Sequence, residues 1–189
     1  KDSERVLQKA MKADPNHGDL LYNLSIFYFT SKNFDEALTY IDKAIKLSRN
    51  NVIYKLLKSE IYINKFNIDE ALIILKDLKN SKNVQEDNNK EIRVSILLSK
   101  AYLKKREYEE AENILLNLIK KNKRLELAYL NLSIIYRDKN QLNKSIKILK
   151  KGINLSPNFM PFYTNLACFY RNSGQLKHAI ETNLFIISK

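Results

Sequence analysis

The sequence predicts an all-α protein that is built as an array of repeats. Its 189 residues include only three Gly and three Pro, which is too little punctuation for a design of short strands and turns. The octet NLSIFYFT at 23–30 returns as NLSIIYRD at 131–138 and as NLACFYRN at 165–172, at separations of 108 and 34 residues. A fixed period of this length is typical of solenoid proteins.

Extending the octets in both directions gives five units and one insertion. The units cover 18–51, 52–85, 92–125, 126–159 and 160–189, and six extra residues lie at 86–91. The insertion belongs to the run NSKNVQEDNNKE at 80–91, which we expect to be a mobile polar loop. We expect the second unit to be the least stable, because Lys58 stands where the other four units have Leu.

Three columns of the aligned units have a packing reason. The eleventh position is always tyrosine, in Tyr28, Tyr62, Tyr102, Tyr136 and Tyr170. The eighth position is small, in Ser25, Ser59, Ser99, Ser133 and Ala167, and so is the twentieth, in Ala37, Ala71, Ala111, Ser145 and Ala179. Small side chains let two helix backbones approach closely, and enlarging one should cost about 1–3 kcal/mol. Removing one of the tyrosines should cost about 3–5 kcal/mol if its ring is buried as an aromatic knob.

This pattern resembles the tetratricopeptide repeat family, which has small residues at positions 8 and 20, an aromatic residue at 11 and often Pro at 32. Pro15 in DPNH and Pro157 in SPNF fall at that last position. The resemblance covers essentially the whole chain, and it implies a right-handed α-α superhelix of antiparallel helix pairs. Residues 1–17 would then be the second helix of a truncated repeat, with Leu7 and Ala10 at its packing positions.

The ends of the expected helices carry further signals. The segments NFDEA at 33–37, NIDEA at 67–71 and REYEEA at 106–111 put acids in the first turn of each second helix, where the helix dipole favours them. The last helix has apolar residues that no following unit covers: Leu184, Phe185, Ile186 and Ile187. We expect either a fragment of a longer protein or a helix that packs against a partner copy.

The composition bounds the partners and the compartment. A formal net charge of +12 suggests nucleic acid or a membrane surface, but the lysines are scattered over every segment, as a general bias toward Lys would produce. The longest apolar stretch, around Leu20 to Ser31, is too short to span a bilayer. The one cysteine, Cys168, excludes an internal disulfide framework and fits a reducing compartment, so that a cytoplasmic location is favoured without being fixed.

The sequence offers no constellation for catalysis. His17 and His178 are far apart in the array, and no cysteine or paired carboxylate completes a metal-ligand set with them. Cys168 has no nearby His in sequence, and Gly18, Gly152 and Gly174 are too isolated to form a phosphate-binding loop. We therefore expect no enzyme, no metal and no cofactor within these residues.

The family resemblance implies a concave groove lined by the first helix of each unit. Its positions 2, 5, 6, 9 and 12–13 carry over to Tyr22, Asn23, Ile26, Phe29, Leu56, Leu57, Arg93, Lys100, Lys104, Asn131, Arg137, Asn165 and Arg171. The N-terminal half of this set is apolar and the C-terminal half is basic, which would complement a peptide with an acidic end. The alternative is that Lys100, Lys104 and Arg137 are merely solvated.

Two binding modes of the family match only in part. The asparagines Asn23, Asn131 and Asn165 resemble a ladder that grips a peptide backbone, but Leu57 and Leu97 break it. No three successive units carry the Lys, Asn and Arg set that clamps a chaperone's C-terminal carboxylate.

Three hypotheses for function remain. The first is a non-enzymatic adaptor that binds a peptide or a helix of another protein in the groove. The alternative is RNA binding by a basic helical-repeat array. A third is self-association through the last helix.

Overall fold

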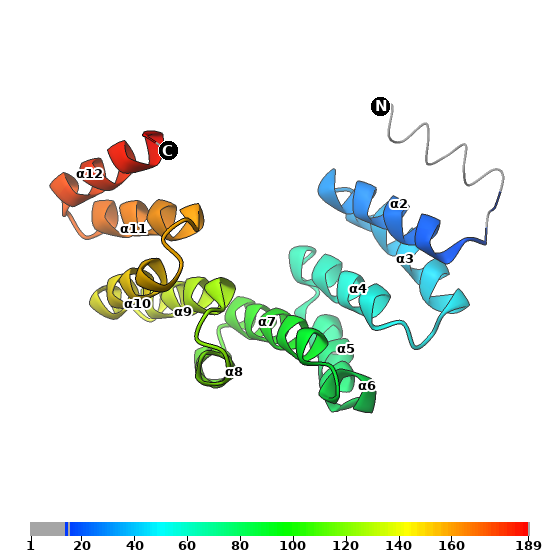
Figure 1. The fold of residues 1–189 in the computed structure, drawn as a ribbon. Coiled ribbons are helices and arrows are strands. Elements are labelled where there is room, and N and C mark those ends of the chain that lie inside the picture. Colours follow the sequence, from blue (N-terminus) through cyan, green and yellow to red (C-terminus); the bar gives the residue numbers. More distant parts are fainter. Residues whose placement is uncertain (1–13, 15, 189) are drawn as a thin grey trace. The chain divides into compact units, whose positions relative to one another are not determined.

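The computed structural model describes residue 14 and residues 16–188, and within these residues it contains eleven α-helices and no β-strand (Figure 1). The all-α helical-repeat fold expected from the sequence is therefore confirmed. The helix expected over residues 1–17, with Leu7 and Ala10, lies almost entirely outside the described part. The chain also divides into two compact halves, which are distinct from the five repeats. Residues 1–104 are called the first unit, and residues 105–189 are called the second unit.

The first unit contains two helix pairs, a short helix and most of a longer one. Helices α2 (Gly18–Thr30) and α3 (Phe34–Leu47) pack against each other, and so do α4 (Val52–Asn64) and α5 (Ile68–Asn80). The short α6 (Lys82–Gln85) contacts α5, and α7 (Asn88–Lys105) follows. Helix α3 also packs on α4, so that one core runs from the first pair into the second: Leu21, Ala37, Ile41, Ala44, Tyr54, Leu57 and Ile61.

Within its described residues, the second unit contains five helices of similar length. It consists of α8 (Tyr108–Lys121), α9 (Glu126–Asp138), α10 (Leu142–Leu155), α11 (Met160–Asn172) and α12 (Leu176–Ile187). Each helix packs against the next, and the core lies between α9, α10, α11 and α12. Its buried members are Tyr129, Ile146, Leu149, Phe162, Leu166, Phe169, Tyr170 and Ala179. We propose that each pair of long helices is one repeat over the ranges expected from the sequence.

The same backbone conformation recurs in the turn after each first helix. The residue at position 15 has a left-handed backbone, with φ between 59° and 74°, in Lys32, Phe66, Arg106, Asn140 and Gly174. In the first pair, the Asn33 amide donates to the Tyr28 carbonyl at 2.8 Å and the Lys32 amide donates to the Phe29 carbonyl at 3.0 Å. This pairing is the Schellman motif, which satisfies the last carbonyls of a helix and reverses the chain.

The residues of the two small columns lie in the interior. All ten side chains are buried, with at most 5% of their surface exposed. In the first pair, the Ser25 hydroxyl donates to the Ala37 carbonyl at 2.8 Å, and in the fourth the Ser145 hydroxyl donates to the Ser133 carbonyl at 2.7 Å. The packing reason given for these columns is confirmed, because positions 8 and 20 touch across each of these two pairs.

The tyrosine column is buried only in part. Tyr136 and Tyr170 are buried, but Tyr28, Tyr62 and Tyr102 are half-exposed. The condition for the full cost of removal, a buried ring, is therefore met by Tyr136 and Tyr170 and not by the other three. Neighbouring side chains cover part of the surface of such a ring: Tyr28 stacks on Tyr40 at 5.3 Å between ring centroids.

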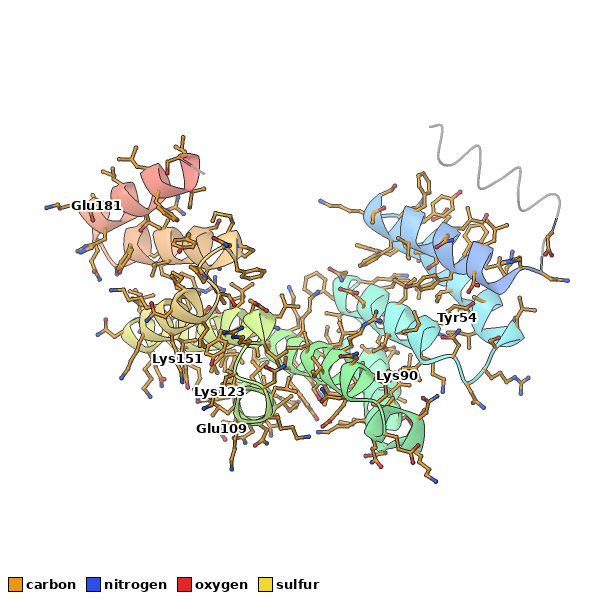
Figure 2. The ribbon with its side chains drawn as sticks, in the orientation of Figure 1. Tyr54, Lys90, Glu109, Lys123, Lys151 and Glu181 are labelled. Carbon is orange, nitrogen blue, oxygen red and sulfur yellow. The ribbon has the colours of Figure 1, made fainter. Side chains whose placement is uncertain are left out.

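The inserted segment is helical, so that the expectation of a polar loop is wrong there. Val84 of α6 is fully buried and fixes the short helix against the first unit. The Asp87 carboxylate then accepts from the Asn89 and Lys90 amides at 3.0 and 3.1 Å, which caps α7 four residues before the expected start at Ile92. Lys90, labelled in Figure 2, donates to Asn83 at 2.8 Å and ties α6 to α7.

Candidate groove on the first helices

The groove residues of the first pair form a row along α2. Tyr22, Ile26 and Phe29 are spaced by four and three residues, so that they share one helix face, and all three are half-exposed. The Tyr22 ring stacks on Tyr54 at 5.4 Å between centroids, and the Phe29 ring lies 6.0 Å from Phe34. Neighbouring aromatic rings therefore hold the row in place and leave its outer edges open to solvent.

Tyr54 is a residue whose role sequence reasoning missed. Its ring is 4% exposed, and its hydroxyl donates to Asp19 Oδ1 at 2.7 Å, which joins α4 to α2 (Figure 2). Burial and the hydrogen bond to Asp19 raise the pKa of Tyr54 to about 12. This bond fixes the platform on which Tyr22 stacks.

Two predicted groove residues of α4 are not available to a ligand. Leu56 is 2% exposed and Leu57 is 8% exposed, and Leu57 belongs to the core of the first unit. The prediction that they face a groove is wrong for this structure, because the apolar side chains of α4 are used for packing. Ile63, at the next turn, is also fully buried.

The basic groove residues of α7 differ in their surroundings. Arg93 is exposed. The Lys100 ammonium lies 3.5 Å from Glu60 of α4, so that its charge has a carboxylate partner within the unit. The Lys104 ammonium lies over the Phe66 ring, 5.1 Å from its centroid.

Phe66 itself was not predicted as a contact residue. It is 72% exposed and has a φ of 65°, which is a strained backbone for a bulky side chain. The signal in the sequence is the fifteenth column, where the same turn uses Gly174 in the last pair.

In the second unit, the predicted groove residues lie on α9 and α11. Asn131 and Asn165 are half-buried, and Arg137 and Arg171 are exposed. The Arg137 guanidinium donates to Asp138 Oδ1 at 2.8 Å and lies 5.5 Å from the centroid of the Phe169 ring. The Asn165 amide donates to the Pro161 carbonyl at 2.9 Å, which uses one of its donors within its own helix. Asn23, in the first unit, is exposed.

The two histidines and the cysteine that were considered for catalysis make contacts within their own helices or with neighbouring side chains. His17 accepts from the Leu20 amide at 3.3 Å and thereby caps α2, and the His178 ring lies 5.1 Å from Tyr170. Cys168 is half-buried, with donors from Arg171 and Asn172 near its sulfur at 3.8 and 3.9 Å. In the described part of the chain, no three His, Cys, Asp or Glu side chains gather as a metal site would require, and no helix has the length and apolar character of a membrane span.

A second polar cluster joins the helices of the second unit. Glu112 of α8 accepts from the Tyr136 hydroxyl and from the Lys139 ammonium, both at 2.9 Å. Burial favours the neutral form of Glu112, but the hydrogen bonds from Lys139 and Tyr136 outweigh it and lower the pKa of the carboxyl. Burial and the same bond raise the pKa of Tyr136 to about 12.

Solved structures with a similar fold span most of this chain. The thermophilic tetratricopeptide repeat protein TTC0263 of Thermus thermophilus is 19% identical, with a TM-score of 0.74 over 88% of each chain. YrrB, described as a tetratricopeptide repeat protein with an unusual peptide-binding site, is 15% identical, with a TM-score of 0.54 over 93% of this chain and 88% of its own. A monomeric mutant of IFIT1 with Gppp-AAAA is 14% identical, with a TM-score of 0.74 over 96% of this chain and 44% of its own.

Sequence comparison identifies the repeat directly. Two tetratricopeptide repeat profiles match the chain, one over residues 1–61 and one over residues 127–159. No curated protein matches the chain significantly. The matched segments, the helix pairs and the small columns agree, and the chain therefore belongs to the tetratricopeptide repeat family.

Proposed function

We propose that the protein is a non-enzymatic interaction module that binds a peptide or a helix of a partner protein on its first helices. The observation that supports this most is the row Tyr22, Ile26 and Phe29 on α2, which is apolar, half-exposed and in contact with neighbouring aromatic rings. An amphipathic helix or an extended peptide packs its apolar side chains against such a row. The peptide-binding site named for YrrB supports the same class of function.

The basic residues of the second unit add a preference for acidic ligands. Arg137 and Arg171 occupy the same position of α9 and α11, and both side chains are exposed. Asp138 partly neutralises Arg137, so that Arg171 is the stronger candidate for a carboxylate of the partner. A guanidinium binds a carboxylate through two parallel hydrogen bonds, which favours acidic peptides at this end.

RNA binding through the groove is the less favoured function. Lys100 and Arg137, two of the basic residues on which it would depend, each have a carboxylate partner, at 3.5 and 2.8 Å. A phosphate would have to compete with these carboxylates. The fold shared with IFIT1 does not itself carry RNA binding to this chain, because the two chains are 14% identical.

The test begins with a peptide selected against the full chain from a random library, whose affinity is then measured by calorimetry. We expect Ile26→Glu to weaken binding at least tenfold, and Arg137→Glu with Arg171→Glu to weaken binding of acidic peptides. The matched control is Ile73→Glu, at a 70% exposed position of α5, which should leave the affinity unchanged.

Salt separates the peptide from RNA in the same assay. Binding of single-stranded RNA should weaken with a log–log slope of about −0.7 per neutralised phosphate, whereas an apolar peptide contact responds far less. Tight RNA binding at physiological salt that Arg93→Glu, Lys100→Glu and Arg137→Glu abolish would overturn the proposal.

Self-association through α12 stays a separate prediction. Leu176, Ile180, Leu184 and Ile187 lie on one stripe of this helix and are 59–81% exposed. Sedimentation equilibrium would show dimers that Leu184→Glu dissociates, and a chain that stays monomeric at high concentration would exclude this interface.

A further inference from the structure

The second helices of the pairs differ in charge, and α10 differs most. Helices α3, α5 and α8 each carry three carboxylates and two lysines, and α12 carries one of each. Helix α10 carries four lysines and no carboxylate, in LNKSIKILKKGINL. A general bias toward Lys adds lysines everywhere, but it does not remove every carboxylate from one helix.

The charge of α10 also opposes the stability of the helix. Helices α3, α5 and α8 begin with two acids in the first turn, which the helix dipole favours, whereas α10 begins with Leu142, Asn143 and Lys144. None of its lysines lies in the last turn, where a positive charge would stabilise the helix. Packing and helix stability therefore do not explain this distribution.

The lysines form one continuous exposed face. Lys144, Lys147 and Lys151 are spaced by three and four residues, Lys150 lies beside them, and all four are exposed. The row from Lys144 to Lys151 is about 10 Å long, at about 1.5 Å per helical residue. Asn143 and Asn154 extend the exposed face at its two ends.

The ammonium groups of this face are not neutralised by carboxylates. Three of them lie over aromatic rings: Lys144 over Tyr136 at 5.8 Å, Lys150 over Tyr170 at 5.8 Å and Lys151 over Tyr129 at 5.9 Å from the ring centroids. Within the described residues, none of the four lysines forms an ion pair with a carboxylate. Lys144 interacts electrostatically with the Glu112 carboxylate, but the ion-pair partner of Glu112 is Lys139, at 2.9 Å.

The face lacks what other anionic partners need. No large apolar side chain of α10 is exposed, so that the face offers no apolar centre for a protein interface and nothing to insert into a membrane. It also offers no exposed aromatic ring on which the bases of a single strand would stack. The phosphates of a duplex need neither, because Lys and Asn side chains contact them directly.

We propose that the lysine face of α10, formed by Lys144, Lys147, Lys150 and Lys151 (Lys151 is labelled in Figure 2), binds the phosphate backbone of a nucleic-acid duplex without reading its sequence. None of these four lysines is among the predicted groove residues, and the site does not depend on the peptide proposal. Three or four lysines would neutralise about as many phosphates, which predicts a salt slope of about −3 for a duplex.

The experiment measures fluorescence anisotropy of a labelled DNA duplex of about 20 base pairs with the full chain, between about 50 and about 200 mM salt. We expect the affinity to fall by about 60-fold over this range, which is the slope above applied to a fourfold change in salt. The variant Lys147→Glu, Lys150→Glu, Lys151→Glu should bind at least tenfold more weakly at low salt, and its slope should fall toward zero. Circular dichroism checks that each variant is folded.

A matched control separates this face from the overall charge. The variant Lys43→Glu, Lys46→Glu, Lys79→Glu makes the same charge change at exposed positions of α3 and α5, and it should bind within about threefold of the wild type. An equal loss in both variants would overturn the proposal, and so would the absence of duplex binding at low salt. Preferential binding to single-stranded RNA, to vesicles with anionic lipid or to polyglutamate would overturn it as well.

Discussion

The contact between Gly152 and Phe162 gives the sharpest test of the packing between two adjacent pairs. Gly152 lies on α10, and a Cβ built there would be 2.6 Å from Phe162 Cζ and 2.9 Å from both Cε atoms of the ring on α11. Phe162 is fully buried, and its ring makes a T-shaped contact with the Phe159 ring, with 4.9 Å between the centroids. The ring has no free space, so that Gly152→Ala must push α11 away from α10.

The net cost follows from two opposing effects. Overpacking a filled core costs about 1–3 kcal/mol. Alanine is the better helix former by about 1 kcal/mol in a helix interior. We therefore expect Gly152→Ala to lower the free energy of unfolding by up to about 2 kcal/mol. Urea denaturation followed by circular dichroism measures this change, and an unchanged m-value would show that both proteins expose the same surface on unfolding.

A double-mutant cycle tests the stated cause. In the Phe162→Leu background the clash is relieved, and Gly152→Ala should then raise the free energy of unfolding by up to about 1 kcal/mol, because only helix propensity remains. The same destabilisation in both backgrounds would refute the reasoning, since the ring would then not be the group that the added Cβ meets.

Three further changes probe other contacts. Asp42→Ala should destabilise the first unit by about 1 kcal/mol in urea denaturation, because the half-buried Lys58, which lies 2.7 Å from Asp42, loses its ion-pair partner. Adding Lys58→Leu should reverse this loss. Equal stability of all variants would show that the ion pair contributes nothing. The pKa of Glu112 is lowered in the folded state, so that the ionised carboxylate stabilises the fold. This stabilisation should be complete above the unfolded pKa of about 4.3 and should be lost as the pH falls through the lower folded pKa. An acid denaturation curve that Glu112→Gln leaves unchanged would contradict this. Phe66→Gly should raise the thermal midpoint by relieving a left-handed backbone at a cost of about 1 kcal/mol, and a lowered midpoint would show that its contact with Lys104 is worth more than the strain.

The helix pairs could be predicted from the sequence because their signals are local and repeated. The small positions that Ser25 and Ala37 occupy recur at a fixed spacing. In the structure the Ser25 hydroxyl donates a hydrogen bond to the Ala37 carbonyl at 2.8 Å. The acids that begin α3, α5 and α8 also lie in the expected first turns. Where packing or the helix dipole requires a small or a charged residue in every repeat, the aligned repeats show the requirement at one position, and no structure is needed to predict it.

The insertion could not be predicted in the same way, because it occurs once. The run at 80–91 is polar in composition, and only the burial of Val84 and the cap made by Asp87 turn it into α6 and the start of α7. Both contacts are tertiary or geometric, and a single copy of a segment offers no column to compare. Asp87 was nevertheless a readable capping signal.

Groove residues predicted only from their positions in a family repeat are not all exposed in this structure. The predicted positions on α2 carry side chains that solvent reaches, whereas the same positions on α4 carry Leu56 and Leu57, which are buried. Side-chain burial depends on what packs from the neighbouring helices, and position alone does not decide it. Pairing with Glu60 and Asp138 likewise changes the charge that Lys100 and Arg137 present.

Site-specific photo-crosslinking tests the central claim, that the first helices bind a peptide, most directly. Benzoylphenylalanine is placed at exposed Asn23 of α2 in one variant and at exposed Ile73 of α5 in another, and each is irradiated with the selected peptide. We predict a peptide adduct from position 23 and none from position 73. An adduct from position 73 alone, or equal adducts from both positions, would contradict the account.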